Sequence, residues 1–169
     1  KMNKINYQKE LDKITDSLNG DVPKLFLHSC CAPCSSYTLE YLNNYFDITV
    51  YYFNPNISPK AEFDKRYAEQ KRLIEALPSK HPIKLVCGEY DYNDFLKIAK
   101  GYENVPEGGE RCFRCYRMRL ESTAKLAKEQ GFDYFCTTLS ISPLKNSQKI
   151  NEIGYEVAEK YGIKWLPSD

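Results

Sequence analysis

Segments of two different hydrophobic periods alternate along this chain, and this alternation constrains its fold more than any other feature. Apolar runs of strand length occur at residues 24–29, 47–54, 82–88, 132–138 and 163–167. Between them, apolar residues recur at the three- and four-residue spacing of amphipathic helices. Strands that alternate with helices favour parallel pairing. The sequence therefore predicts an α/β fold, with a three-layer, Rossmann-like, mostly parallel sheet and helices on both faces.

The helical segments follow from this spacing and from their end signals. Ser58 is the expected N-cap of the third one, because Pro59 then occupies the first helical position. The helices are expected at about 7–18, 35–46, 59–78, 91–101, 116–131 and 150–161. A chain of 169 residues with 42% hydrophobic content buries one substantial core. We therefore expect a single α/β domain over residues 1–169, with residues 1–20 as an N-terminal helical segment.

The charge balance and the distribution of apolar residues limit the partners and the compartment. The net charge is only +1, so contacts with nucleic acid require a local basic patch. The first twenty residues contain no apolar core of signal-peptide length, and no apolar run reaches the roughly 18 residues of a membrane span. These observations predict a cytoplasmic protein that makes no membrane contact. A reducing compartment disfavours disulfides, so the seven cysteines are better suited to metal binding or catalysis.

Five of the cysteines form two groups, one after a predicted strand and one before a predicted helix. Cys30, Cys31 and Cys34 come directly after the first strand, and Cys112 and Cys115 lie in the loop that leads into the long helix. In parallel sheets the functional crevice lies beyond the carboxyl ends of the strands, where such loops meet. Two C-x-x-C pairs in one chain are also a strong metal-binding signal. The sequence therefore predicts a cysteine-rich site at this edge of the sheet.

Several kinds of chemistry fit these thiols. A structural zinc ion takes four thiolates, which the two pairs supply, and it leaves Cys30 without a role. A cubane iron–sulfur cluster also takes four thiolates, but neighbouring cysteines at a strand end reach its separated corners with less strain. The "CAPC" motif at 31–34 is also typical of thioredoxin-like thiol–disulfide oxidoreductases, in which a helix N-terminus activates one cysteine. That alternative explains only Cys31 and Cys34. Inert buried thiols are the remaining interpretation.

Three other residues are better explained by packing than by chemistry. His28 lies on an apolar strand two residues before Cys30, and a hydrogen-bonded core histidine is favoured there over a metal ligand. Cys87 and Cys136 each lie within a predicted strand. Because free cysteine behaves as a small hydrophobe, both are expected to be buried.

Basic residues cluster around the second cysteine pair. Such a run is either a solvated helix face or a set of partners for the charge of a metal cluster and for RNA phosphates. The loop at 139–147 places Lys145 and Asn146 between a strand end and a helix N-terminus, where an anion binds favourably. The same residue types also make ordinary loops. The four guanidinium groups of the run belong to Arg111, Arg114, Arg117 and Arg119.

Several separate blocks of the chain together resemble a known enzyme family. The blocks "LHSCCAPCS", "YYFNPNISP", "ERCFRCYRMRL" and "GFDYFCTTLSISPLKN", in this order, are similar to epoxyqueuosine reductases of the QueH type. The resemblance runs from about residue 24 to the end. It implies a fold of the adenine-nucleotide-hydrolase-like (HUP) class and an oxidoreductase of tRNA processing. The implied reaction, the last step of queuosine biosynthesis, reduces the epoxide of epoxyqueuosine at the wobble position of tRNA and draws on an external electron donor.

The same resemblance implies a metal centre and a set of substrate contacts. A [4Fe-4S] cluster is expected on four thiolates, those of Cys30, Cys31, Cys112 and Cys115. A second, mononuclear iron is expected close to it. In some members of the family an aspartate stands where this sequence has Cys34, so Cys34 is expected in the metal site and the catalytic centre. Its role there stays open between cluster ligand, ligand of the second iron and free thiol.

Two further expectations concern the substrate and the end of the chain. By the resemblance, a basic helix and a Cys-Gly-Cys segment are expected after Asp169, and they are not part of this sequence. Candidate contacts to the phosphates or the nucleotide are Arg111, Arg114, Arg117, Lys145 and Asn146.

Overall fold

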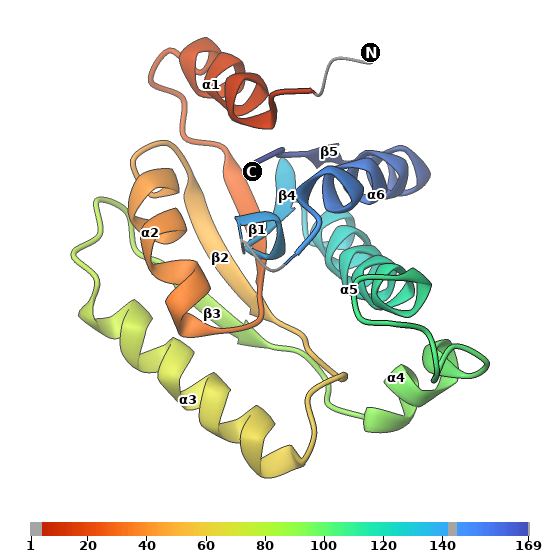
Figure 1. The fold of residues 1–169 in the computed structure, drawn as a ribbon. Coiled ribbons are helices and arrows are strands. Elements are labelled where there is room, and N and C mark those ends of the chain that lie inside the picture. The colour runs from red at the N-terminus through yellow and green to blue at the C-terminus, as the bar shows by residue number, and fades with distance from the viewer. Residues whose placement is uncertain (1–4, 142–144, 169) are drawn as a thin grey trace.

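The strands of the computed structural model, which describes residues 5–141 and 145–168, form one all-parallel sheet (Figure 1). Neighbouring strands follow the order β3-β2-β1-β4-β5. In the central register, Leu27 lies opposite both Val50 and Cys136. The predicted α/β class is therefore confirmed. The sequence predicted a mostly parallel sheet, and all four strand pairings in the described residues are parallel. The strands are β1 (Lys24–Ser29), β2 (Asp47–Tyr52), β3 (Lys84–Cys87), β4 (Tyr134–Thr137) and β5 (Lys164–Trp165).

Helices cover both faces of this sheet. Figure 1 shows α2 and α3 on one side and α5 and α6 on the other, which makes three layers. In the part of the chain that the structure describes, no helix combines the length and the apolar character needed to cross a membrane. The helices are α1 (Tyr7–Ser17), α2 (Ala32–Leu42), α3 (Lys60–Ala76), α4 (Tyr92–Ala99), α5 (Glu110–Glu129), the short 3-10 helix η1 (Leu139–Ile141) and α6 (Ser147–Tyr161).

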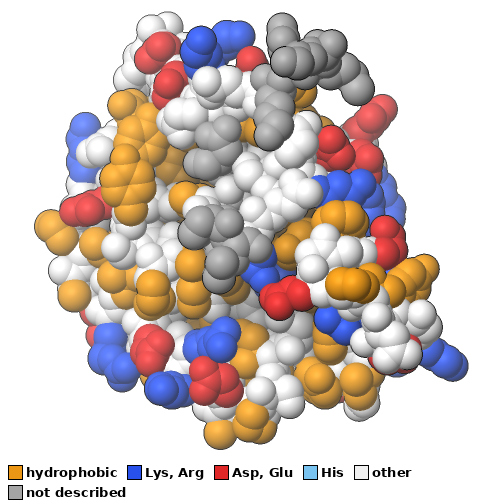
Figure 2. All heavy atoms as spheres, viewed as in Figure 1, with side chains coloured by type: hydrophobic (Ala, Val, Ile, Leu, Met, Phe, Trp, Pro, Cys, Tyr) orange, Lys and Arg blue, Asp and Glu red, His pale blue; other side chains and the backbone are white. Residues whose placement is uncertain are grey.

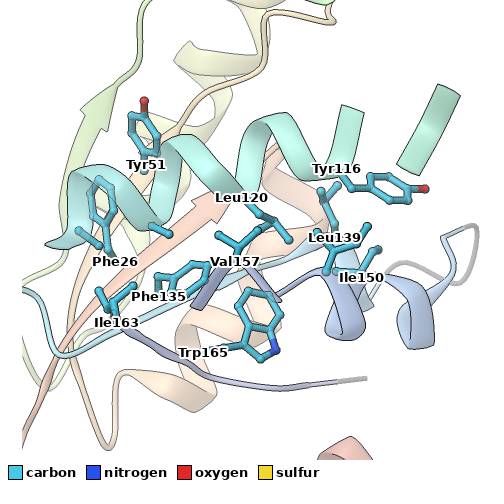
Figure 3. Close-up of a cluster of buried hydrophobic side chains, with 13 residues drawn as sticks. Phe26, Tyr51, Tyr116, Leu120, Phe135, Leu139, Ile150, Val157, Ile163 and Trp165 are labelled. Carbon is cyan, nitrogen blue, oxygen red and sulfur yellow. The ribbon is translucent and has the colours of Figure 1, made fainter. Parts of the chain in front are cut away.

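Alternate residues of the central strands supply two hydrophobic cores. On β1, Phe26 faces α5 and α6, where it packs in one buried cluster with Phe135 and Trp165 (Figure 3). Its neighbours Leu25 and Leu27 face the opposite side and pack with side chains of α1 and α2. This two-residue alternation is what a strand covered on both faces requires. The double burial fixes β1 at the centre of the molecule.

The charged outer face of α3 is solvated. Lys60 pairs with Asp64, and Arg66 pairs with Glu62, each one helical turn apart. Figure 2 shows basic and acidic side chains alternating over this helix. Because the charges alternate in sign, α3 does not form the local basic patch that contact with nucleic acid requires.

Three expectations about individual residues were wrong. The N-cap of α3 is Pro59 and not Ser58. Helix α5 begins at Glu110, so Cys112 and Cys115 lie in its first two turns and not in the preceding loop. Cys87 is exposed, because β3 is an edge strand whose residues are poorly covered. Cys136 is buried as expected, at 3% exposure. Part of the predicted loop at 139–147, namely residues 142–144, lies outside the described residues.

Candidate metal centre

The chain topology brings both cysteine groups to the same edge of the sheet. Successive connections run outward from β1 through β2 to β3, then return across the sheet to β4 and continue to β5. The order therefore reverses between β1 and β4, and a crevice opens beyond the carboxyl ends of these two strands. Cys30 follows directly after the last residue of β1. Helix α5 begins at the same edge because it carries the chain from β3 back to the start of β4.

The first cysteine group forms the turn between β1 and α2. Cys31 is the N-cap of α2, and Pro33 stands in the first turn of that helix. The Sγ atoms of Cys30 and Cys31 are 3.9 Å apart. A hydrogen bond with Cys30 lowers the pKa of Cys34, whereas a hydrogen bond with Cys30 raises the pKa of Cys31. Between these two, Cys34 is therefore the thiol that ionises more readily.

Cys30 makes this turn differ from a thioredoxin-like site. In such a site the helix N-terminus activates the thiol at the helix start by lowering its pKa. Here the thiol at the helix start is Cys31, and its pKa is raised. The contact that opposes ionisation comes from Cys30, which the "CAPC" motif does not include. The neighbouring cysteine thus changes the chemistry of the motif.

The second cysteine group lies on the first two turns of α5. Cys112 and Cys115 are three residues apart, so they share one face of the helix. The backbone N–H of Gly108 donates a hydrogen bond to Sγ of Cys112 over 3.3 Å. Cys115 is buried and Cys112 is half-buried. Cys112 thus lies in the first turn of α5 with a backbone N–H directed at its sulfur.

Arg119 connects the second group to the end of β1. Its guanidinium is buried, donates from Nη1 to Oδ1 of Asn54 over 3.3 Å, and faces the backbone oxygen of Cys115. Asn54 in turn donates from Nδ2 to the backbone oxygen of Ser29 over 2.9 Å. The positive charge of Arg119 also acts electrostatically on Cys30. A continuous polar path therefore runs from α5 to the first cysteine group.

A cleft of about 170 Å³ opens beside these residues. Its walls include Cys112 and Cys115 together with three cations, Arg111, Arg119 and Lys145. Lys145 also acts electrostatically on Cys34. Larger surface hollows lie elsewhere, such as one of about 430 Å³ beside α2, but no cysteine lines it. The cleft at the cysteines thus combines two thiols with three basic side chains and one acidic side chain, that of Glu107.

A buried polar network holds the turn that contains Cys30 and Cys31 in place. Ser29 donates from Oγ to Oε1 of Gln70 over 2.8 Å, and Ser35 donates to the backbone oxygen of Cys31 over 2.7 Å. Gln70, Ser29 and Ser35 are all fully buried. Through Gln70, helix α3 thus holds the end of β1 and the start of α2 together. The network fixes the backbone that presents the thiols.

His28 is a structural residue, as its position on an apolar strand predicted. Its Nε2 donates to the backbone oxygen of Phe53 over 2.9 Å, so its Nδ1 accepts from the hydroxyl of Thr137, also at 2.9 Å. Burial, and secondarily the charge of Arg119, lowers the pKa of His28 from 6.5 to about 3. Both ring nitrogens are engaged and the ring is neutral. His28 therefore ties β1 to β2 and β4 and leaves no nitrogen for a metal.

The structure separates the candidate substrate contacts into two sets. Arg111 and Lys145 line the cleft. Arg114 instead donates to the backbone oxygen of Ile98 over 2.7 Å and lies over the ring of Tyr102. Two further residues make internal contacts: Arg117 forms an ion pair with Glu156 on α6, and Asn146 caps the N-terminus of α6.

The donor set fits a metal centre in its chemistry, although the thiols are not arranged around one point. In the described ranges, no three or more Cys, His, Asp or Glu side chains lie where they would hold a single ion. The five thiols nevertheless lie at one edge of the sheet, and a backbone N–H points at one sulfur. The buried guanidinium of Arg119, for which no ion pair is found in the described ranges, lines the cleft with two of them. Thiolates select zinc, copper(I) and iron–sulfur clusters. The residues therefore suit an anionic, thiolate-bound group.

Fold and site together define a Rossmann-like α/β protein with a cysteine-rich, positively lined cleft at the switch point of a parallel sheet. The model of the family "Epoxyqueuosine reductase QueH" matches residues 25–169, so the chain belongs to the epoxyqueuosine reductase QueH family and is an enzyme. This membership confirms the resemblance seen in the four sequence blocks.

Individual relatives give the same result over nearly the whole chain. An epoxyqueuosine reductase QueH of Staphylococcus epidermidis is 47% identical over 175 residues, which span 100% of this chain and 74% of that protein. Its counterpart in Streptococcus pyogenes is 42% identical, spanning 98% of this chain and 67% of that protein. The protein of the same name in Thermotoga maritima is 34% identical, spanning 84% and 72%.

Proposed function

We propose that this enzyme reduces the epoxide of epoxyqueuosine in tRNA to give queuosine, with an iron–sulfur centre as its cofactor. The observation that carries the proposal is the family match over residues 25–169, which includes both cysteine groups. The substrate is the one printed in the name of the relatives. Because the substrate is tRNA, the reaction belongs in the cytoplasm. The reduction removes the epoxide oxygen as water, and it consumes two electrons and two protons from an external donor and the solvent.

The cofactor in this proposal is a [4Fe-4S] cluster on the thiolates of Cys30, Cys31, Cys112 and Cys115. When bound, such a cluster supplies electrons one at a time. The chain supports this ligand set through the turn held by Gln70 and through the N–H that Gly108 directs at Cys112. A second, mononuclear iron is proposed beside the cluster, and Cys34 is the thiol available for it.

Cys34 is the residue that we propose for the reacting side of the centre. It is half-buried, its pKa is lowered by the hydrogen bond with Cys30, and Lys145 lies near it. A thiol in this setting holds a soft metal ion or delivers a proton. Arg111 and Lys145 are the proposed phosphate contacts, because their cations line the cleft. Phosphate contacts position a nucleic acid without reading its sequence, so they orient the tRNA at the thiols.

The test is reconstitution of the full chain with iron and sulfide under anaerobic conditions. We expect about four iron and four sulfide per chain for one cubane, a broad visible absorbance, and conversion of epoxyqueuosine in tRNA when a reductant is added. The matched variants are Cys112→Ser, which removes a proposed ligand, and Cys136→Ser, which removes a buried thiol outside the site. Only the first should lose the cluster. A loaded wild-type protein that leaves the epoxide intact contradicts the proposed reaction.

A single thiolate-bound metal ion is the second candidate for the cofactor. The 3.9 Å between Sγ of Cys30 and Sγ of Cys31 is close to the edge of about 3.8 Å that Zn–S bonds of about 2.3 Å give in a tetrahedral site. Sulfide analysis distinguishes the two candidates. One equivalent of zinc or iron without inorganic sulfide would favour the single ion, and sulfide in equal amount to iron favours the cluster.

A further inference from the structure

Arg119 is a buried cation without an acidic partner in the parts of the chain that the structure describes. The residue is 4% exposed. Its nitrogens face the backbone oxygen of Cys115 and Oδ1 of Asn54, which are both uncharged. Every ion pair found in the described ranges involves other residues. An uncompensated buried charge is costly, so proteins place such a group beside an opposite charge.

The position of Arg119 points to the thiols as the source of that opposite charge. It follows Cys115 by four residues and Cys112 by seven, so all three share one face of α5. It lines the cleft together with both cysteines. Its charge also acts on Cys30, which belongs to the other cysteine group. The guanidinium therefore shares a cleft with two of the four proposed cluster ligands and acts electrostatically on a third.

The other arginines of the same helix do not share this environment. Arg117 has a carboxylate partner, Glu156. Arg114 contacts a backbone oxygen and an aromatic ring, as Arg119 does, but it is only half-buried. Arg111 lies at the mouth of the cleft, is partly exposed, and donates to the backbone oxygen of Glu103 over 2.9 Å. Among the four, Arg119 alone is both buried and directed at neutral acceptors.

We propose that Arg119 is the internal counter-charge of the thiolate-bound centre and that it raises the reduction potential of that centre. The inference rests on the proposed iron–sulfur cofactor. A cluster on four thiolates is anionic, and each added electron makes it more negative, so a fixed adjacent cation stabilises the reduced form. Burial strengthens the effect because little water screens the charge. Asn54 acts with Arg119 as the group that orients it, through the bond from Nη1 to Oδ1.

The experiment is a redox titration of the reconstituted full chain and three variants under anaerobic conditions. Arg119→Gln removes the charge, and Arg119→Lys keeps it. Lys125→Gln removes one charge from an exposed position of the same helix, away from the cleft. We expect Arg119→Gln to shift the one-electron equilibrium toward the oxidised form at least tenfold, which is about 59 mV. Arg119→Lys should stay near the wild type, and Lys125→Gln should match it.

Each outcome bears on the proposal. A loaded Arg119→Gln protein with the wild-type potential overturns it. If Arg119→Gln folds, as circular dichroism and a cooperative melt show, but binds no cluster while Arg119→Lys does, the counter-charge is required and the proposal holds. If both variants lose the cluster or the fold, the shape of the guanidinium matters and not its charge, which overturns it. Wild-type protein that binds no iron or sulfide instead refutes the proposed cofactor.

Discussion

Lowering the pH from 7 to 5 should destabilise the metal-free protein through His28, whose ring is buried. Burial lowers the pKa of His28 from 6.5 to about 3 in the folded state, and the unfolded chain returns to 6.5. Below pH 6.5 the unfolded state therefore binds a proton that the folded state does not. Stability rises with pH wherever the unfolded state binds more protons, so it must fall as the pH drops. At about 1.4 kcal/mol per pH unit, the loss is about 2 kcal/mol between pH 7 and pH 5.

Urea denaturation of the metal-free protein at several pH values measures this loss. His28→Gln keeps one donor and one acceptor for Phe53 and Thr137 but has no titrating group in this range, so its stability should lack the pH dependence of the wild type. His81→Gln is the matched control, because it removes the other histidine, and it should retain the dependence that comes from His28. The comparison uses the difference between pH 7 and pH 5 within each variant, so an overall destabilisation does not matter. A wild-type difference below about 0.5 kcal/mol, or an equal difference in His28→Gln, would refute the reasoning.

Two further predictions concern packing and tRNA binding. A Cβ added at Gly154 of α6 would overlap the indole of Trp165. Gly154→Ala should therefore lower the free energy of unfolding by about 1 to 3 kcal/mol in denaturant titrations. Unchanged stability would contradict that packing. Arg111→Gln and Lys145→Gln should each weaken tRNA binding and lower the slope of log affinity against log salt by about one. Arg117→Gln, whose native side chain is ion-paired with α6, should leave the slope unchanged, and an equal loss there would argue against the cleft as the phosphate site.

The strands could be predicted from the sequence, but their places in the sheet could not. The run at 24–29 matches β1 residue for residue, because its apolar centre, Leu25, Phe26 and Leu27, is buried on both faces of the sheet. The run at 82–88 contains β3 as well, yet Cys87 is exposed. A local sequence pattern does not show which strand will be outermost in the sheet. The order β3-β2-β1-β4-β5 depends on the packing of the whole chain.

The location of the cysteine site could be predicted from the sequence, but its full set of residues could not. Parallel strands end at one edge, so the convergence of loops there follows from the alternating pattern alone. The start of α5 was missed because residues 110–115 show no apolar period. The burial of Arg119 was not predicted, because arginine is rarely buried, and the whole arginine run was interpreted either as a solvated helix face or as partners for a metal cluster and RNA phosphates. The signal available in the sequence was the spacing of Arg119, four residues from Cys115 and seven from Cys112, which places all three on one face of a helix.

The charge distribution explains how a protein of net charge +1 holds several ionisable thiols at one place. Helices α2 and α5 both direct their N-termini at the site, with Cys31 and Gly109 as their N-caps. These dipole ends favour anions without adding to the net charge. Arg119 and Lys145 add full positive charges at the same cleft. Acidic residues on solvated faces such as α3 offset these charges and are screened, and one further acid, Glu107, lines the cleft itself. An almost neutral chain thus maintains a locally positive site that suits thiolates and a polyanionic substrate.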